Sequence, residues 1–590
     1  MAANRTLAEL FDRMAKVLEL TGANRFKVNA YQRGSRALRD AVVEVDTLDR
    51  SVAALTEIEG IGKGLAEKII EYLDTGHVAE HDQVVATVPP GVLAMLDVPG
   101  LGPKTVATLW KQADIESIDA LKAALDSDAL ASLPRMGARR IESLRKSLAF
   151  IGSAESRVRI GRAYPVAIYF VEQLARHEPV RRVEYAGSLR RGAETIGDVD
   201  ILCACEEGFD VAAVFCNLDP VEHVLARGAT KCSVRIEGGL QVDLRIVDED
   251  RFGAALMYFT GSKEHNVRLR ERALKRNLRL NEYGLWRADE QTDASADAHD
   301  AQAQAAEPVA AATEADVYAA LDLAWVPPEL REDRGEIAAA EAGELPDLVS
   351  LDDIRCELHA HTVASDGRLS IDEMAALAAD RGFHTLAITD HSASQVQARG
   401  LDVERLERHI EAVREADGRH KNIKLLAGSE VDILADGRLD YPNSLLKQLD
   451  IVVASPHAAL SQPPAKATGR LRRAIDHPLV HMIGHATGRL INRRPGLTPD
   501  FAELFKAAAD AGVAFEINAN PARLDLRDTQ ARAAIDAGVK LAVNTDAHSA
   551  ADLETLRFGV LTARRAWATA ADVVNCLDAA CLWAWLKQRR

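Results

Sequence analysis

Hydrophobic positions follow different periodicities in different parts of the chain. In residues 1–150, apolar side chains recur at helical spacing, as in Leu7–Leu20, which predicts amphipathic helices broken at glycine-rich turns. The runs 198–202 and 241–245 alternate polar and apolar residues, which predicts strands. From about Leu351, short β-rich runs alternate with amphipathic helices at a spacing of roughly 30 residues, which predicts repeated βα units. We expect several domains, because 590 residues exceed what one hydrophobic core supports.

Two turns of the helical region share one pattern of hydrophobic residues and glycines. Ile58–Gly64 reads IEGIGKG and Val98–Lys104 reads VPGLGPK, and both resemble helix-hairpin-helix motifs. Such a turn exposes backbone N–H groups at a helix start, so it can bind DNA phosphates without reading sequence. A plain corner with glycine caps is the alternative, but the second copy favours DNA binding. A third turn, Leu133–Gly137, lacks the first glycine. The candidate DNA-binding residues are Gly60, Gly62, Gly64, Gly100, Gly102 and Lys104.

A pair of carboxylates marks the strand predicted at residues 198–202. Asp198 and Asp200 are two residues apart, so both side chains project from the same face of the strand. Two like charges so close together are costly unless a cation lies between them. A third carboxylate, Asp243, lies in the second strand-like run. The three acids therefore predict a cation site.

A turn suited to phosphate precedes these aspartates. Gly187 and Ser188 form a small turn with free backbone N–H groups, and Arg190 and Arg191 follow. A guanidinium binds phosphate oxygens with two parallel hydrogen bonds. Three carboxylates beside such a turn are what two-metal nucleotidyl transfer requires. We prefer this interpretation to a surface turn with exposed acids, because groups that bind anions and cations occur together.

Residues 187–202, GSLRRGAETIGDVDIL, resemble the palm signature of family X DNA polymerases. Residues 258–262, Asn266 and residues 281–283 resemble the nucleotide-binding segment of that family, whereas residues 263–265 depart from the pattern of its animal repair enzymes. The resemblance implies that two Mg²⁺ or Mn²⁺ ions bind to Asp198, Asp200 and Asp243. It implies nucleotide contacts from Gly187, Ser188, Arg191, Gly197, Tyr258, Phe259, Gly261 and Asn266.

The same resemblance implies a role for each part of this set. Asp243 would activate the primer 3′-hydroxyl, and Arg191 with Ser188 would hold the β- and γ-phosphates. Tyr258 and Phe259 would line the sugar pocket, and Asn266 would reach the base or the minor groove.

The first hairpin belongs, by the same resemblance, to a small domain that binds the 5′-phosphate of a gap. Residues 25–31, RFKVNAY, supply cations and an aromatic ring for phosphate and base. Lys68 matches the position of the Schiff-base lysine that carries out 5′-deoxyribose-phosphate lyase chemistry. A lysine at this position is also an ordinary solvated helix residue, so both interpretations stay open.

Metal-type ligands lie at the ends of successive predicted strands in the C-terminal region. In a barrel of βα units the carboxyl ends of the strands form one mouth, where chemistry gathers. A lone histidine at a strand end is usually structural, but six histidines, two aspartates and one glutamate are too many for accident. Since thiolates are absent, these ligands fit a cluster of two or three Zn²⁺, Mn²⁺ or Fe²⁺ ions. The nine residues are His359, His361, Asp366, His391, Glu430, His457, His485, Asp546 and His548.

This region resembles the polymerase and histidinol phosphatase (PHP) domain, and the nine ligand positions of that domain are present. A cluster of this kind generates hydroxide near neutral pH and neutralises a phosphodiester transition state. Arg489 and Arg523 are candidates for holding the substrate phosphate. Asp390 and Asn518 are candidates for orienting the ligands.

Charge and cysteine content narrow the cellular context. The net charge of −17 argues at first against nucleic acid, but residues 1–286 carry only −2 and residues 287–590 carry −15. A nearly neutral first half with clustered arginines can bind a phosphate backbone locally.

Seven cysteines without a CxxC pair predict reduced thiols. No apolar signal core is visible, and the apolar run 577–586 is too short to span a bilayer. We expect a cytoplasmic protein with no membrane partner.

These features predict a multidomain α and α/β chain. A helical helix-hairpin-helix region would precede a nucleotidyltransferase palm with a mixed β-sheet and a distorted C-terminal (β/α)7 barrel. The predicted boundaries are 1–85 for a 5′-phosphate and lyase-like domain, 86–150 for a second hairpin domain that binds duplex, 151–286 for the palm and nucleotide-binding subdomain, 287–350 for an acidic flexible linker, and 351–590 for the PHP domain.

The two halves together resemble a bacterial family X DNA polymerase fused to a PHP domain. This resemblance implies a monomeric polymerase that uses dNTPs to fill short gaps in base excision repair. Its substrate would be gapped or primed double-stranded DNA, and its PHP domain would be a metal-dependent 3′→5′ exonuclease. As alternatives, the PHP site is an AP endonuclease or acts on small phosphomonoesters. A third alternative is a DNA-end-binding scaffold without activity, against which the three intact aspartates argue.

Overall fold

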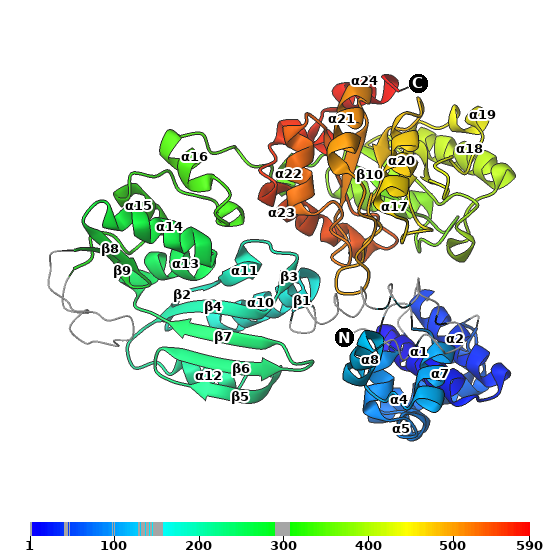
Figure 1. The fold of residues 1–590 in the computed structure, drawn as a ribbon, viewed down its shortest axis with the longest axis horizontal. Coiled ribbons are helices and arrows are strands. Elements are labelled where there is room, and N and C mark those ends of the chain that lie inside the picture. Colours follow the sequence, from blue (N-terminus) through cyan, green and yellow to red (C-terminus); the bar gives the residue numbers. More distant parts are fainter. Residues whose placement is uncertain are drawn as a thin grey trace. The chain divides into compact units, whose positions relative to one another are not determined.

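The computed structural model describes the chain from residue 3 to residue 589 with gaps. Residues 41–44, 46–47, 59, 97, 99–100, 128–129, 131–135, 137–140, 142–143, 145–156 and 289–306 lie outside the description. Contacts divide the chain into two units, residues 1–155 with 492–495 and residues 156–491 with 496–590, and we describe each by itself (Figure 1). Among the described helices, none has the length and apolar composition that a bilayer crossing requires.

The first unit is helical, as its periodicity predicts. One apolar cluster joins Phe11 and Met14 to Ile69, and a second one surrounds Val106 and Leu109. Both clusters are built from side chains at helical spacing, which supports the sequence interpretation of this region. The helices are α1 (Ala3–Thr21), α2 (Arg25–Asp40), α3 (Val52–Leu55), α4 (Lys63–Thr75), α5 (Ala79–Val85), α6 (Pro90–Met95), α7 (Pro103–Ala113) and α8 (Ile118–Asp126).

A five-stranded sheet with the order β2-β4-β7-β6-β5 begins the second unit. Its central strands β4 (Asp198–Cys205) and β7 (Gln241–Ile246) run parallel, and the other neighbours run antiparallel. At the start of β4, Val199 and Ile201 face a core that includes Phe170, so the two aspartates project from the opposite face. The other elements are β1 (Val158–Arg159), α10 (Ile160–Ala175), β2 (Val180–Tyr185), α11 (Gly187–Arg190), β3 (Thr195–Ile196), α12 (Val211–Cys216), β5 (Val221–Arg227) and β6 (Lys231–Ile236).

The segment after the sheet corrects one sequence prediction. Residues 287–350 were expected to form a flexible linker, yet residues 307–350 fold against the preceding helices. Val317, Tyr318 and Leu321 are buried in one core with Leu285. The expectation failed because composition alone does not show which acidic residues are paired inside; residues 289–306 lie outside the description. The elements of this segment are α13 (Phe252–Thr260), α14 (Lys263–Leu274), β8 (Leu278–Asn281), β9 (Gly284–Arg287), α15 (Glu314–Ala320) and α16 (Glu336–Ala342).

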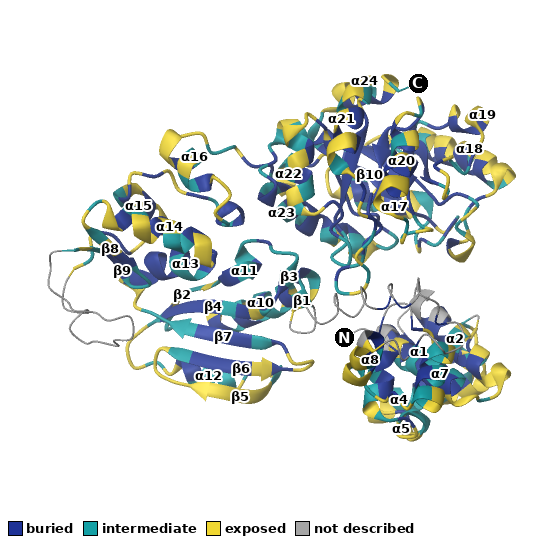
Figure 2. Cartoon of the chain, in the orientation of Figure 1, coloured by how far each residue is buried: buried dark blue, intermediate teal, exposed yellow. Residues whose placement is uncertain are grey.

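Seven parallel strands form the predicted C-terminal barrel, in the order β10 to β16. A parallel bridge between Ala360 and Ala547 nearly closes it. Figure 2 shows the strands as almost wholly buried, which explains why they read as continuous apolar runs. The strands are β10 (Cys356–Ala360), β11 (Thr385–Ile388), β12 (Lys424–Asp432), β13 (Ile451–Ser455), β14 (Met482–Ile483), β15 (Ala514–Asn518) and β16 (Leu541–Asn544).

Two apolar layers surround these strands. Leu358, Leu426 and Val453 pack with Trp585 of the last helix in one cluster, while a larger cluster lies between the strands and the other helices. The helices are α17 (Ile371–Asp380), α18 (Val403–Arg419), α19 (Asn443–Leu446), α20 (Pro464–Ile475), α21 (Phe501–Ala511), α22 (Asp528–Asp536), α23 (Leu556–Arg565) and α24 (Ala579–Lys587). The fold class predicted from sequence is confirmed, because the hairpin region, the mixed sheet and the parallel barrel are all present.

The sheet domain and the barrel share one hydrophobic core. Leu524 and Phe558 of the barrel are buried with residues of the palm, and the Phe558 ring packs edge-on against Tyr164 at 5.7 Å. A line of ion pairs runs beside this core. Arg565 of α23 bonds to Glu332 at 2.8 Å and to Asp528 at 2.9 Å. Its guanidinium also donates to the backbone carbonyl of Arg191 at 2.8 Å. The two domains are therefore joined by both apolar and charged contacts.

Replacing Arg565 with alanine should destabilise this junction. The substitution removes three hydrogen bonds from a mostly buried site, while Glu332 keeps Arg191 and Asp528 keeps Arg334 as partners. Because each carboxylate retains one arginine, we expect a loss of about 2–3 kcal/mol rather than the full cost of an unpaired buried charge. Urea unfolding of the full chain measures the loss. Arg532→Ala, a half-buried arginine paired within α22, should unfold near the wild-type midpoint, and an equal midpoint for both variants would contradict the prediction.

Candidate functional site

The three aspartates of the palm meet at one end of the parallel strand pair. In the register of β4 and β7, Asp200 lies beside Asp243, and Asp198 precedes it on the same face. One oxygen of each carboxylate lies within 4.8 Å of the others. Asp198 is exposed, whereas Asp243 is buried. The sequence prediction that these side chains converge therefore agrees with the geometry.

Burial and like charge raise the proton affinity of Asp200 within this cluster. Desolvation, then the charges of Asp198 and Asp243, raises the pKa of Asp200 to about 7. Lys231 lies 3.0 Å from the Asp243 carboxylate, and Gln241 donates to it at 2.8 Å. Lys231 was missed from sequence, because only the pairing of β6 with β7 brings it to the acids. The cluster has the charge pattern of a cation site.

The phosphate-binding turn lies directly against these acids. Gly187 has φ of +64°, and a Cβ built on it would lie 2.2 Å from the Asp200 Oδ2 atom, so only glycine fits there. The backbone N–H of Ala186 donates to the carbonyl of Asp200 at 2.8 Å. Arg191 donates to Glu332 at 3.0 Å and to the Thr260 carbonyl at 2.8 Å. Its guanidinium is thus held beside the turn.

The predicted nucleotide segment forms a compact corner between α13 and α14. The Asn266 amide donates to the carbonyl of Tyr258 at 2.7 Å, and the Tyr258 and Phe259 rings meet edge-on at 5.3 Å. A Cβ on Gly261 would lie 2.4 Å from the Asn266 side chain, so this position also requires glycine. His265, in the segment that departs from the family pattern, is buried and lies 2.6 Å from Glu336. The contact of His265 with Glu336 therefore packs α14 against α16.

The nine predicted ligands of the barrel converge at the carboxyl ends of its strands. Three overlapping groups each have ligand atoms within 4.8 Å of one another, and His361 and His391 each belong to two groups. The Glu430 carboxylate lies at their centre, 2.8 Å from both His391 Nδ1 and His485 Nε2. The groups are His361, Asp366, His391 and His548; then His359, His361 and Asp546; and then His391, Glu430 and His457.

The unpaired atoms of this cluster fit metal ligands. Both Glu430 oxygens, both His485 nitrogens and the Nε2 atoms of His359 and His457 are buried without a hydrogen-bond partner among the described residues. Such atoms are costly unless another ligand satisfies them. Burial, then the neighbours His548 and His391, lowers the pKa of His361 to about 4, so its imidazole is neutral and able to ligate. With nitrogen and oxygen donors and no thiolate, the set suits Zn²⁺ or Mn²⁺.

Comparison with known proteins agrees with this geometry. The DNA polymerase/3′-5′ exonuclease PolX of Bacillus subtilis (strain 168) is 35% identical over 589 residues, which cover 99% of both chains. The chain belongs to the bacterial PolX family. DNA polymerase lambda of Rattus norvegicus is 26% identical over 306 residues, 48% of this chain and 49% of that protein. A probable phosphatase of Thermoanaerobacter sp. (strain X514) is 29% identical over 249 residues, 40% of this chain and 95% of that protein.

Four models of protein families match this PolX chain: two in the helical region, one after the palm sheet and one in the barrel. A helix-hairpin-helix domain covers residues 2–78, and a SAM-like helix-hairpin-helix tandem covers residues 92–149. The DNA polymerase beta thumb covers residues 255–332, and the PHP domain covers residues 357–520. The thumb match includes most of the segment that was expected to be a linker, in agreement with its fold.

An outer layer of acids holds the PHP ligands of this PolX chain in place. Glu516 accepts from the backbone N–H of His485 at 2.8 Å and lies 2.7 Å from His359 Nδ1, while Asp432 bonds to His457 Nδ1. Such contacts fix the ring orientation and the tautomer of a ligand. Sequence analysis missed both acids, although Glu516 lies two residues before Asn518 and Asp432 lies two residues after Glu430. Of the two residues predicted to orient ligands, Asn518 contacts a predicted ligand, whereas Asp390 contacts residues next to ligands in the sequence. Asp390 accepts from Thr362 and Ser365, and Asn518 donates to Asp546 at 3.0 Å.

The two arginines predicted to hold phosphate differ in their surroundings. Arg489 is buried and donates to Glu194 at 2.7 Å and to the Leu524 carbonyl, so it connects the PHP loop with the palm. The prediction for Arg489 overlooked this contact, because the two residues are far apart in sequence. Arg523 is half-buried, beside the turn that follows β15.

The first hairpin of this PolX chain has the open backbone that phosphate binding requires. Gly62 caps the start of α4, and Gly62, Lys63 and Gly64 are all exposed. Gly60 has φ of +98°, which glycine adopts without strain. Gly102 caps α7 in the same way in the second hairpin, and Lys104 follows it. Gly100 and most of the third turn lie outside the described residues.

Lys68 lies in an ion pair. Its ammonium group is 2.6 Å from Glu80, which Lys27 also contacts at 2.6 Å. Burial alone would raise the pKa of Glu80, but hydrogen bonds from Lys27 and Lys68 lower it to about 2. The carboxylate therefore stays charged at neutral pH and holds both lysines.

Mg²⁺ binding to the palm should depend on pH. Because the pKa of Asp200 is about 7, a proton competes with the ion below neutral pH. We expect the affinity for Mg²⁺ to fall about tenfold between pH 8 and pH 6. Calorimetry of Mg²⁺ binding to the His359→Ala variant, in two buffers of different ionisation enthalpy, should detect proton release near pH 6.5. An affinity that is constant over this range would contradict the prediction.

Proposed function

We propose that this chain fills short gaps in DNA with dNTPs and removes nucleotides from 3′ ends at a second site, as part of base excision repair. One observation carries the proposal: three carboxylates against a phosphate-binding turn occur in the same compact unit as nine converging metal ligands. The PolX relative supports it, because its name records both activities. The expectations of a monomer and of a cytoplasmic location stay predictions.

In the palm, Asp198, Asp200 and Asp243 would hold two Mg²⁺ or Mn²⁺ ions, which stabilise charge on the transferred phosphate. The turn of Gly187 and Ser188 would offer backbone N–H groups to the triphosphate. Arg191 would bind the same oxygens after exchanging its bond with Glu332 for one with phosphate. Asp243, buried beside the other two acids, would orient the primer 3′-hydroxyl for in-line attack.

In the PHP domain, the nine ligands would hold two or three Zn²⁺ or Mn²⁺ ions, which activate water and neutralise phosphodiester charge. The protein's own part is to orient the imidazoles. Glu516 and Asp432 fix two of the rings, and burial excludes competing water. The donor set supports this arrangement without selecting one metal.

A labelled primer on a gapped duplex with a 5′-phosphate tests both activities in Mn²⁺. Wild-type protein should extend the primer with dNTPs and shorten it without them. If the primer is extended and never shortened, the nuclease half of the proposal fails.

A phosphatase or AP endonuclease activity of the PHP domain is a second candidate. The similarity to a probable phosphatase over this region favours it. p-Nitrophenyl phosphate and a duplex with an abasic site distinguish these activities from the exonuclease. Hydrolysis of the monoester at the rate of oligonucleotide shortening would favour the small-molecule activity.

Lyase chemistry at Lys68 is a third candidate that borohydride trapping tests. A Schiff base forms from a neutral amine, whereas Lys68 is bonded to the Glu80 carboxylate. We therefore expect weak trapping of a 5′-deoxyribose-phosphate end by the wild type, a severalfold increase in Glu80→Gln, and none in Lys68→Ala. Lys122→Ala, an exposed lysine of α8 outside both hairpins, is the control. Equal trapping by all variants would exclude Lys68 as the nucleophile.

A further inference from the structure

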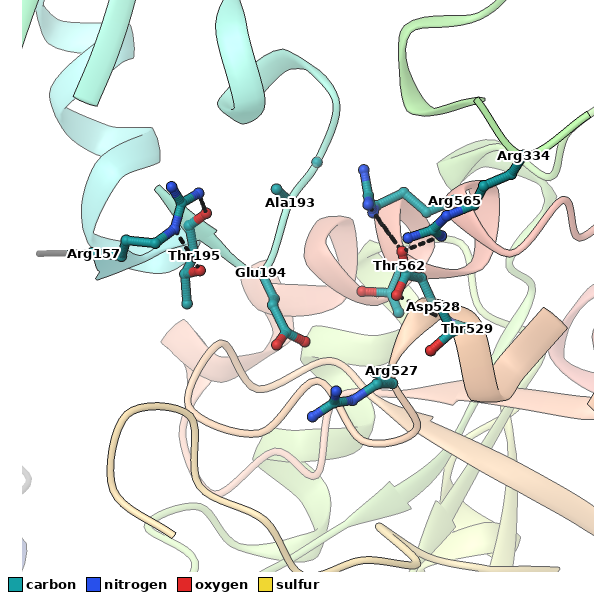
Figure 3. Close-up of a pocket in the computed structure, with 11 residues that line it drawn as sticks. Arg157, Ala193, Glu194, Thr195, Arg334, Arg527, Asp528, Thr529, Thr562 and Arg565 are labelled. Carbon is teal, nitrogen blue, oxygen red and sulfur yellow. Dashed lines mark hydrogen bonds and ion pairs between the residues drawn. The ribbon is translucent and has the colours of Figure 1, made fainter. Parts of the chain in front are cut away.

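A cavity of about 260 Å³ lies where the palm and the PHP barrel meet, within the second unit. Figure 3 shows Arg157, Glu194 and Thr195 of the palm on one side and Arg527 and Arg565 of the barrel on the other. The lining contains four arginines and two carboxylates, which gives two net positive charges. The lining residues are Arg157, Gly192, Ala193, Glu194, Thr195, Arg334, Arg527, Asp528, Thr529, Thr562 and Arg565.

The two acids of the cavity are already neutralised by neighbours. Glu194 accepts from Arg489 at 2.7 Å. Asp528 bonds to Arg334 and Arg565, each at 2.9 Å. Arg527, by contrast, is exposed and forms no ion pair with any carboxylate that the structure describes. Arg565 is also bonded to Glu332 at 2.8 Å, so Arg527 is the lining guanidinium that we expect to meet an anion from solvent.

Contacts join the palm side of the cavity to segments next to ligands of both sites. Arg157 donates to Thr195 and lies against Gly197, where an added Cβ would be 3.2 Å from its Nη1 atom. Gly197 directly precedes the palm ligand Asp198. Glu194, on the same palm loop, is bonded to Arg489, which follows the PHP ligand His485 by four residues. An anion bound here would therefore contact residues that are linked to segments of both sites.

We propose that this cavity binds backbone phosphates of the DNA strand whose 3′ end passes from the palm to the PHP site. The inference rests on the proposed exonuclease function. Guanidinium groups suit phosphodiesters, and a cavity of this size accommodates a phosphate together with several waters. The palm side of the lining contains the small residues Gly192, Ala193 and Thr195. Without base-reading groups, the binding would be independent of sequence.

Charge reversal at Arg527 tests the proposal with a matched control. Arg532→Glu alters a half-buried arginine of the helix that begins next to Arg527; its guanidinium lies over the Trp567 ring and does not line the cavity. Binding of a fluorescent single-stranded 12-mer to the full chain is measured in EDTA over a range of salt. We expect Arg527→Glu to weaken binding about tenfold relative to Arg532→Glu. The plot of log binding constant against log salt concentration should become less steep by about 0.7, which is the change expected for one lost phosphate contact. Thr529→Glu, at an exposed position of the same cavity, should act in the same direction.

Two further measurements, of primer shortening and of small-diester hydrolysis, distinguish the possible explanations of a binding defect. In Mn²⁺, Arg527→Glu should shorten a mismatched primer about tenfold more slowly than Arg532→Glu. Both variants should hydrolyse bis(p-nitrophenyl) phosphate alike, because none of the nine PHP ligands lines the cavity. Identical binding by the two variants overturns the inference. Loss of micromolar pyrophosphate binding in Arg527→Glu, with oligonucleotide binding unchanged, also overturns it in favour of a free-anion site. If wild-type protein shortens no DNA, the proposed function fails, while the EDTA measurement still decides the cavity.

Discussion

Replacing Asp200 with alanine should lower nucleotide incorporation by about 10³-fold or more, while 3′ shortening persists. Asp200 lies close to Asp198 and Asp243, and its pKa of about 7 reflects burial first and then the charges of these two carboxylates, which a cation would neutralise. Losing this ligand removes several kcal/mol of charge stabilisation from the transition state, and each 1.4 kcal/mol is about a factor of ten in rate. Single-turnover extension of a gapped primer at saturating dNTP measures the effect on the chemical step.

The controls for this variant separate chemistry from folding and DNA binding. Asp219→Ala, an exposed aspartate of the palm, should extend the primer at the wild-type rate. Asp200→Ala should bind the gapped duplex normally, because the hairpins of the first unit are untouched. The variant should also unfold no earlier, since removing a like charge relieves repulsion at neutral pH. Extension within tenfold of the wild type would contradict the assignment of Asp200 as a metal ligand of the polymerase site.

The barrel site was predictable from the sequence because the parallel strands of a barrel place their carboxyl ends at one mouth. His359, His391 and Glu430 lie far apart in sequence, but each terminates a strand of one barrel, and the carboxyl ends of such strands meet at one mouth. The aspartates of the palm were predictable for a similar reason. A period of two residues places Asp198 and Asp200 on one face, whatever the rest of the sheet does.

Residues whose role depends on tertiary pairing were not predictable in this way. Lys231 reaches Asp243 only through the pairing of β6 with β7, and Arg489 reaches Glu194 across a domain junction. The linker prediction failed for the same reason. Glu314 reads as part of an acidic run, yet it is buried against Arg190 and Arg331. Composition reports how many acids a segment has, and only the fold shows which of them are paired inside.

Replacing Glu430 with glutamine should nearly abolish 3′ shortening and remove bound metal. The Glu430 carboxylate lies within 3.7 Å of five histidines, and both of its buried oxygens lack hydrogen-bond partners among the described residues. Burial alone would raise the pKa of Glu430, but His457, His359 and His391 hold it well below its usual range, so the group enters the cluster as an anion. Glutamine keeps the size of the side chain and removes its charge, and we expect about a 10³-fold loss of excision.

Metal analysis distinguishes this loss from a general defect. Glu430→Gln should retain fewer Zn²⁺ or Mn²⁺ ions per chain after dialysis, and its melting temperature should respond less to added metal, because ligand binding stabilises only a chain that holds the ion. Glu404→Gln, an exposed glutamate in the first turn of α18, should behave as the wild type in both measurements. Primer extension should stay near the wild-type rate in both variants, since the palm keeps its own ligands. A Glu430→Gln variant that keeps its metal and still shortens 3′ ends at the wild-type rate would remove the cluster from the nuclease mechanism.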